Sequence, residues 1–161
     1  MRKLSMVVVA LVLGALPALG AKPGPLPDFD LMTAEGTAFN SRNFTVDRQW
    51  LILYLQPGCR SCETLLHLIK NQRNHPNLVR RIVIIEEGMT AAELRRLKLQ
   101  FPDLAQARWY TSPPKSVQRG LKLSGAPVVL GMGRRTIQWS INGLLSRDGT
   151  QIRNAMESWT R

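Results

Sequence analysis

The chain has 161 residues, of which 44% are hydrophobic, and it carries a formal net charge of +11. This length predicts a single domain with a sizeable core. The basic residues are scattered as isolated pairs, without a long cluster or an interleaved aromatic stripe. We therefore expect no nucleic-acid partner, and we interpret the charge as a solvated basic surface that favours acidic partners or anionic lipid headgroups.

Residues 1–21 have the layout of a secretory signal peptide. Arg2 and Lys3 form a positive start, an uninterrupted small and aliphatic run follows at 6–16, and small residues then stand where a signal peptidase cleaves. We therefore expect an exported, soluble chain over 22–161 with a net charge of +9, which is the full +11 less the two residues at the start.

The alternative for this segment is an uncleaved membrane anchor. A spanning helix needs about 20 apolar residues. The stretch 6–21 has only sixteen residues and contains Pro17, so the sequence favours cleavage.

The rest of the chain predicts alternating strands and helices. The continuous apolar run at 50–55 is typical of a strand buried on both faces. Thr90 and Glu93 form a capping box that opens a helix. In chain order we predict a strand at 50–55, a helix at 59–74, a strand at 81–85, a helix from Thr90 to Pro102, a short strand at 107–110, a helical turn at 115–119, strands at 128–132 and 136–141, and a helix at 148–159.

The order of these elements indicates the fold class. A strand–helix–strand half is followed by a hairpin, with a three-residue loop at Gly133-Arg134-Arg135, and by a last helix. Such an order predicts an α/β sandwich in which a central mixed sheet has helices on both faces.

Both cysteines lie in the segment Cys59-Arg60-Ser61-Cys62. A structural disulfide is one interpretation for an exported protein. However, a bridge that closes about four residues gains roughly 2 kcal/mol of stability and joins no distant segments. The pair instead lies where a buried strand turns into a helix, which favours redox chemistry.

Position also distinguishes the two sulfurs. At the helix N-terminus, unpaired N–H groups and the helix dipole favour a thiolate at Cys59, and Arg60 adds a positive charge. Cys62 falls on the apolar face of the helix with Leu65, Leu66 and Ile69. We therefore expect Cys59 to be exposed and nucleophilic, and Cys62 to be the shielded, resolving thiol.

Metal binding is the third interpretation of the pair. Zinc takes four ligands. His67 projects from nearly the opposite side of the helix to Cys62, and His75 lies beyond the helix end, so we expect neither histidine to join the cysteines and no metal site.

Taken together, the motifs resemble the thioredoxin superfamily. The CxxC segment, the segment 125–129 with Ala126 and Pro127, the hairpin and the segment 141–146 all have counterparts there. Leu26-Pro-Asp-Phe-Asp-Leu31, Glu35-Gly36 and Phe39 resemble the N-terminal extension of its TlpA-like and peroxiredoxin-like branch. The resemblance implies a thioredoxin-like three-layer sandwich over 22–161.

The resemblance also implies roles. Cys59 would be the attacking thiolate and Cys62 the resolving thiol. Pro127, in the cis form, would hold the backbone of Ala126 against the CxxC turn, where it can pair with a substrate strand.

The sequence departs from the family at several positions. Gly58 stands where most members have Trp, and Leu53 stands where thioredoxin has a buried acid. Glu86 or Glu87 could replace that acid, although we interpret them as a solvated surface pair. Gln56 stands where peroxiredoxins have Thr, which argues against a peroxidase.

The function that we predict is that of a periplasmic protein thiol–disulfide oxidoreductase, acting as a monomer without a cofactor beyond its dithiol. Its partners would be exported proteins with cysteines and a redox partner protein, in a pathway such as cytochrome maturation or the assembly of secretion or conjugation machinery. The alternative is a non-catalytic adaptor or assembly factor of the same fold, including a metal-sensing one.

Overall fold

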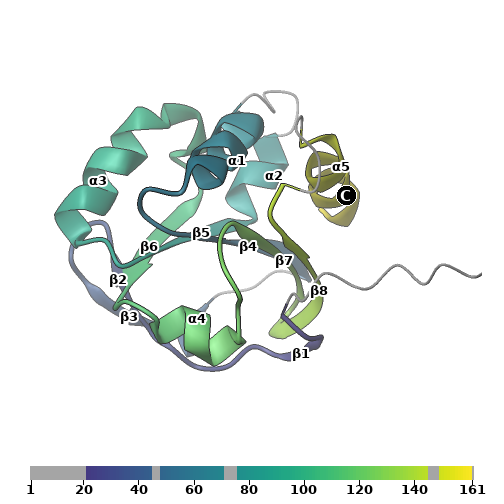
Figure 1. Cartoon of the computed structure of the whole chain (residues 1–161), viewed down its shortest axis with the longest axis horizontal. Coiled ribbons are helices and arrows are strands. Elements are labelled where there is room, and N and C mark those ends of the chain that lie inside the picture. The colour runs from purple at the N-terminus through teal and green to yellow at the C-terminus, as the bar shows by residue number, and fades with distance from the viewer. Residues whose placement is uncertain (1–20, 45–47, 71–75, 145–148, 161) are drawn as a thin grey trace, which may run out of the picture.

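The structure is a computed structural model that describes residues 21–44, 48–70, 76–144 and 149–160. Its eight strands form one mixed sheet in the order β1-β8-β7-β4-β5-β6-β2-β3 (Figure 1). The parallel pairs are β4–β5 and β5–β6, and the remaining neighbours are antiparallel. The strands are β1 (Gly24–Pro25), β2 (Asp30–Thr33), β3 (Ala38–Asn40), β4 (Gln49–Leu55), β5 (Ile82–Glu87), β6 (Arg108–Ser112), β7 (Val128–Gly133) and β8 (Thr136–Asn142).

Helices cover both faces of this sheet, which confirms the predicted fold class. Four helices lie above the sheet in Figure 1 and α4 lies below it. The helices are α1 (Arg60–Lys70), α2 (Pro76–Arg80), α3 (Ala91–Gln100), α4 (Ser116–Leu121) and α5 (Thr150–Trp159), with short 3₁₀ turns at η1 (Ser41–Asn43) and η2 (Pro102–Leu104).

Strand β4 lies at the centre of two hydrophobic cores. Its alternating side chains Leu51, Leu53 and Leu55 enter the core beneath α1, whereas Trp50, Ile52 and Tyr54 enter the core beside α4. All six are fully buried. The continuous apolar run that predicted a two-sided strand is explained by these two cores.

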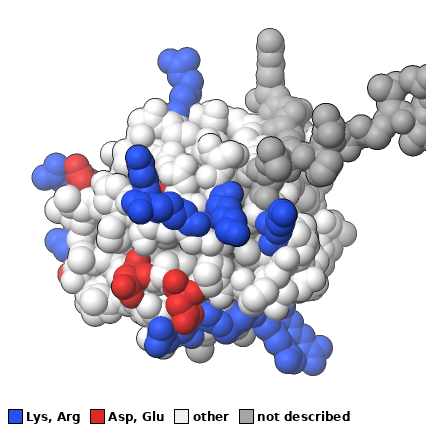
Figure 2. Space-filling model, turned by 60° about the horizontal axis from the view of Figure 1, so that its bottom comes forward, with Lys and Arg blue, Asp and Glu red and all other residues white. Residues whose placement is uncertain are grey.

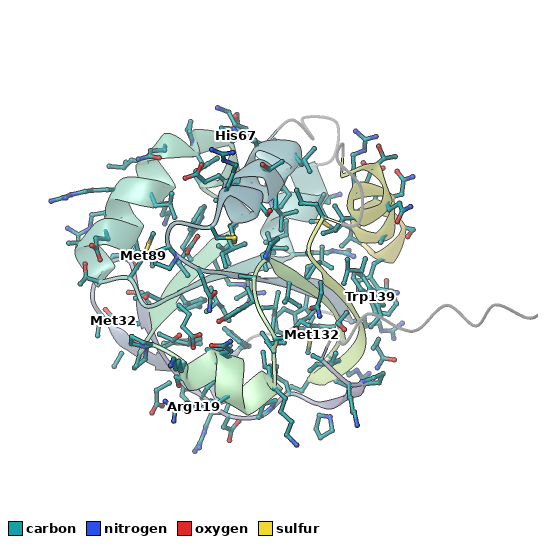
Figure 3. All side chains as sticks on the ribbon, in the orientation of Figure 1. Met32, His67, Met89, Arg119, Met132 and Trp139 are labelled. Atoms are coloured by element: carbon teal, nitrogen blue, oxygen red, sulfur yellow. A yellow bond between two sulfur atoms is a disulfide. The ribbon has the colours of Figure 1, made fainter. Side chains whose placement is uncertain are left out.

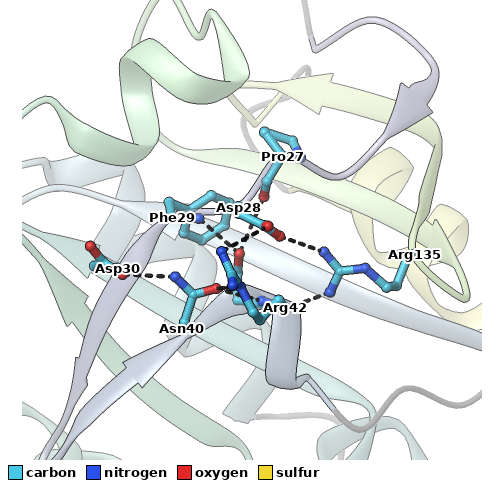
Figure 4. A network of polar contacts seen from close by, with 8 residues as sticks. Pro27, Asp28, Phe29, Asp30, Asn40, Arg42 and Arg135 are labelled. Atoms are coloured by element: carbon cyan, nitrogen blue, oxygen red, sulfur yellow. Dashed lines mark hydrogen bonds and ion pairs between the residues drawn. The ribbon is translucent and has the colours of Figure 1, made fainter.

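The N-terminal segment is attached to the sheet by a polar network (Figure 4). Ser41 is completely buried; its Oγ accepts from the N–H of Phe29 at 2.9 Å and donates to the carbonyl of Pro27 at 3.2 Å. Asp28 forms ion pairs with Arg42 and with Arg135 of the β7–β8 turn. These contacts hold the β2–β3 hairpin in place beside β6.

On the face shown in Figure 2, basic side chains form a row, and others lie at the margins of this view. In α4 and its caps, Lys115, Arg119 and Lys122 are exposed, while Val117 and Leu121 are buried. Val117 and Leu121 are four residues apart, so they lie on one side of the helix and face the core, and the basic residues face solvent.

Several predicted elements need correction. The β7–β8 loop has two residues rather than three, because Gly133 ends β7 and Thr136 begins β8. The helix predicted at 59–74 begins at Arg60, and its predicted end lies outside the described residues. Pro76, predicted to follow that helix as a stop, opens α2, because proline fits the first turn of a helix. The signal peptide predicted at 1–21 lies outside the described residues except for Ala21, which is buried in the core beside α4 and whose carbonyl accepts from the Ser140 hydroxyl at 3.0 Å.

Gly131 is required by the packing of β7 against β8. A Cβ atom at this position would collide with the indole ring of Trp139, which packs edge-on against Trp159 of α5 at 5.8 Å. We predict that Gly131→Ala lowers the free energy of unfolding by roughly 1–3 kcal/mol, because the ring must move. Urea unfolding measures this change.

Gly120→Ala is the matched control. Its Cβ would lie at ordinary contact distance, 3.9 Å from Pro27, within a helix that favours alanine. Equal losses of stability in the two variants would contradict the packing argument.

Candidate redox site

The CxxC turn is built where β4 ends and α1 begins. β4 ends at Leu55, and the N–H of Cys59 donates to the carbonyl of Gln56 at 3.3 Å. Gly58 has a φ of +72°, which an L side chain rarely adopts. The bulky residue that the family places here is therefore disfavoured by this turn.

Cys59 and Cys62 form a disulfide at the first turn of α1. Cys62 is buried with an exposed fraction of 2%, and Cys59 is partly exposed. The N–H of Cys62 donates to the Sγ of Cys59 at 3.2 Å. This contact places a backbone donor against the sulfur that was predicted to be the thiolate, so the geometry favours negative charge at Cys59.

The loop before β7 lies against this turn. The Ala126–Pro127 peptide bond is cis, and the Sγ of Cys59 is 3.6 Å from the carbonyl oxygen of Ala126. Pro127 is buried and its carbonyl accepts from the N–H of Gly143 at 2.8 Å. The structure thus brings together Cys59, Cys62, Ala126 and Pro127, while the side chain of Arg60 is exposed beside them.

Glu86 and Glu87 are buried, so their interpretation as a solvated surface pair is wrong. Each has an exposed fraction of 3%. They extend β5 beyond its apolar residues 82–85, and because side chains alternate along a strand, they enter different cores. The absence of a turn residue before Gly88 is the signal in the sequence that the strand continues through both acids.

Glu86 lies on the α1 side of the sheet, near the CxxC turn. It is paired in register with Leu55 of β4, and its neighbours Ile82 and Ile84 share a core with Cys62. Its Oε2 has no hydrogen-bond partner among the described residues. Burial, together with the negative charge of Glu63, raises the pKa of Glu86 to about 7.

Glu87 lies on the other side of the sheet and connects the redox turn to α4. Its carboxylate accepts from the Tyr54 hydroxyl at 2.5 Å and from the N–H groups of Val117 and Gln118 at 2.6 and 3.2 Å. Gln56 in turn donates to the Tyr54 oxygen at 2.7 Å. Burial and the adjacent Glu87 raise the pKa of Tyr54, so its hydroxyl remains a donor. This network was not predicted from the sequence.

The described residues contain no cluster of three or more His, Cys, Asp or Glu side chains that could hold a metal ion. His67 is exposed and its ring packs against Phe101 at 5.1 Å. His75 lies outside the described residues. Nor does any helix within the described ranges combine the length and the apolar character that a bilayer crossing requires.

Comparisons with known proteins agree with this architecture. No family model and no curated protein matches the sequence. Among solved structures, the chain is similar to a thiol:disulfide interchange protein of the thioredoxin family from Chlorobium tepidum, at a TM-score of 0.61 and 14% identity, over 88% of this chain and 99% of that one.

Two further structures are similar. One is a secreted disulfide oxidoreductase from Mycobacterium tuberculosis, at a TM-score of 0.62 and 9% identity, over 81% of this chain and 95% of that one. The other is ScoI from Arabidopsis thaliana, solved with copper bound, at a TM-score of 0.57 and 12% identity, over 87% of this chain and 97% of that one. At these identities the likeness shows the fold, which is the thioredoxin fold predicted from the CxxC segment and the order of elements.

The raised pKa of Glu86 predicts a pH-dependent stability. In the folded protein Glu86 keeps its proton up to about pH 7, whereas in the unfolded chain it loses that proton near pH 4.5. The free energy of unfolding should therefore fall as the pH rises from 4.5 to 7 and stay low above pH 7. We predict that Glu86→Gln raises the free energy of unfolding at pH 8 by up to roughly 3 kcal/mol and changes it little at about pH 4. Denaturation at a series of pH values measures this difference.

Glu63→Gln provides the comparison, because it removes a negative charge that raises the pKa of Glu86. In this variant the fall in stability should still begin near pH 4.5, but it should end at a lower pH and be smaller in total. An identical pH dependence in wild type and Glu86→Gln would contradict the assignment of the buried proton.

Proposed function

We propose that this thioredoxin-fold protein is an exported protein thiol–disulfide oxidoreductase that exchanges disulfides with other exported proteins through Cys59 and Cys62. The observation that carries the proposal is the asymmetry of the pair. A partly exposed sulfur lies at a helix N-terminus beside the carbonyl of Ala126, and the second sulfur is buried behind it. A structural bridge has no need of this arrangement.

The exchange proceeds in two steps. In the reducing direction, the Cys59 thiolate attacks one sulfur of a substrate disulfide and releases the other as a thiolate. Cys62 then loses its proton and attacks the Cys59 sulfur, which releases the second substrate thiolate. The protein ends oxidised and the substrate gains two electrons. The two substrate thiolates then take up two protons, of which one corresponds to the proton lost by Cys62 and the other comes from solvent, because Cys59 reacts as a thiolate; the oxidising direction is the reverse of these steps.

Glu86 is the group best placed to take the proton of Cys62. It is buried on the same side of the sheet, one strand away from the strand that leads into the CxxC turn. A carboxyl with a pKa of about 7 can give or take a proton near neutral pH. Leu53, at the position where thioredoxin has its buried acid, is fully buried and apolar and cannot exchange a proton. We therefore assign this role to Glu86 on the neighbouring strand β5.

Substrate capture is proposed for the backbone of Ala126. An extended segment that pairs with this loop would bring its cysteine to the Cys59 sulfur, 3.6 Å from the Ala126 carbonyl. Export is supported by the composition of residues 1–21 and by the likeness to a secreted oxidoreductase. The exposed basic residues of α4 support acidic partners or an anionic surface.

The second candidate is a non-catalytic adaptor or metal-handling protein of this fold. The small residue at Gly58 and the apolar Leu53 favour it, as does the likeness to ScoI, solved with copper bound. Only two sulfur ligands are present in the described site. Exchange activity distinguishes the two candidates.

We predict that wild-type protein reduces the disulfides of insulin in the presence of dithiothreitol and that Cys59→Ser abolishes this activity, because it removes the attacking sulfur. Cys62→Ser should accumulate mixed disulfides through Cys59, since the resolving thiol is missing. Non-reducing gels of exported-fraction proteins would reveal these complexes. If Cys62→Ser traps nothing while Cys59 remains open to alkylation, the adaptor candidate replaces the oxidoreductase.

Arg60 should affect the redox balance. Its positive charge stabilises the thiolate of the reduced form and makes the disulfide more oxidising, so Arg60→Ala should lower the reduction potential by roughly 10–30 mV. Because Arg60 is exposed, added salt should shrink the difference. Equilibration with glutathione buffers measures the potential, and Arg96→Ala on α3 serves as the control for a change in net charge alone. An effect of equal size in both variants would contradict the local role of Arg60.

A further inference from the structure

An open groove of about 680 Å³ lies at the edge of the sheet beyond β5. This volume is within the range of known ligand sites. Its walls come from three places: the β2–β3 hairpin, the turn after β5 and the end of β6. Met32 and Ala38 line it from the hairpin, Met89 from the turn, and Ser112 and Pro113 from the end of β6. We call it the Met32–Met89 groove.

The groove lies on the same edge as the redox pair. β4, β5 and β6 are parallel neighbours, so their carboxyl ends meet at one edge. Cys59 follows β4, Met89 follows β5 and Pro113 follows β6. Strands are about 4.8 Å apart, so the groove begins roughly 10 Å from the end of β4. Met89 and Met32 both lie on the β2–β3 side of the disulfide in Figure 3.

The groove exists because β2 and β6 separate. They pair only at Met32↔Thr111 and Thr33↔Tyr110. Beyond this point β6 ends and Pro113 and Pro114 follow, which have no N–H groups to continue the ladder. Ser112 is left at the point of separation with an exposed fraction of 3%, and its Oγ has no hydrogen-bond partner among the described residues.

The lining of the groove indicates the kind of ligand that it can hold. The lining is largely apolar, and its one charged residue, Asp30, already accepts from the side chain of Asn40 at 2.7 Å. Two methionines adapt to side chains of different shape. The occupant that fits is an apolar side chain carried on a polypeptide.

We infer that the Met32–Met89 groove binds an apolar side chain of the protein substrate while the substrate's cysteine is held at Cys59. This inference rests on the proposed function and adds its substrate class. An extended chain covers about 3.3 Å per residue, so the apolar residue lies about three to five residues from the substrate cysteine.

The test uses the reduced full protein and peptides whose single cysteine is linked by a disulfide to a coloured aryl thiol. The Cys59 thiolate attacks the peptide sulfur and releases the aryl thiolate, which is measured; Cys62 then releases the peptide. A leucine is moved from one to six residues away on either side of the cysteine in an otherwise polar peptide. The expected result is a rate constant about tenfold higher at one spacing in the three-to-five range.

Variants assign this preference to the groove. Met32→Lys, at a position with 41% exposure, should abolish the leucine preference, whereas Leu99→Lys, at an exposed leucine outside the groove, should retain it. The control variant Leu99→Lys should also react with oxidised glutathione at the wild-type rate.

The outcomes separate the two levels of the proposal. If neither peptides nor glutathione disulfide react with wild type, the proposed function fails. If they react without a leucine preference, or if Leu99→Lys loses the preference as fully as Met32→Lys does, the groove inference is overturned while the function stands. Self-association that Met32→Lys abolishes would instead identify a second copy as the occupant, and would likewise overturn the inference.

Discussion

The burial of β4 on both faces is the constraint on which the rest of the structure depends. Its residues 50–55 are fully buried between two cores, with parallel β5 on one side and antiparallel β7 on the other. Because β4 and β5 run in one direction and β7 in the other, the carboxyl ends of the first two and the start of β7 share one edge. The CxxC turn, the two buried acids and the Ala126–Pro127 loop therefore meet at this edge.

The buried acids give this edge its electrostatic character. Glu87 is fully hydrogen-bonded, by Tyr54 and by the first N–H groups of α4, and thus has a structural role. Glu86 has an unpaired oxygen and a raised pKa. Burying such a carboxyl lowers the stability of the fold, and carboxyls of this kind are common at sites where a residue exchanges a proton. Two adjacent residues of the same type thus have different surroundings because the strand directs them to opposite faces.

The sequence predicted the central part of this arrangement and missed the parts that depend on distant contacts. The apolar run of β4 and the apolar spacing of Cys62, Leu65 and Ile69 are local patterns, so β4 and the orientation of α1 could be predicted. The β2–β3 hairpin was missed because its strands have four and three residues and β2 pairs with β6 far along the chain. The groove that follows from this pairing has no local signal, and the burial of Glu86 depends on α1 packing over it.

The reduction potential of the Cys59–Cys62 pair tests the central claim most directly. A disulfide that exchanges with substrates must lie within the range of cellular thiol buffers, whereas structural disulfides lie below about −300 mV. Equilibration of the full protein with glutathione and dithiothreitol buffers, read by alkylation and mass spectrometry, gives this value. A reversible two-electron transition between roughly −120 and −280 mV is predicted. A pair that stays oxidised until well below −300 mV would contradict the account and identify the disulfide as structural.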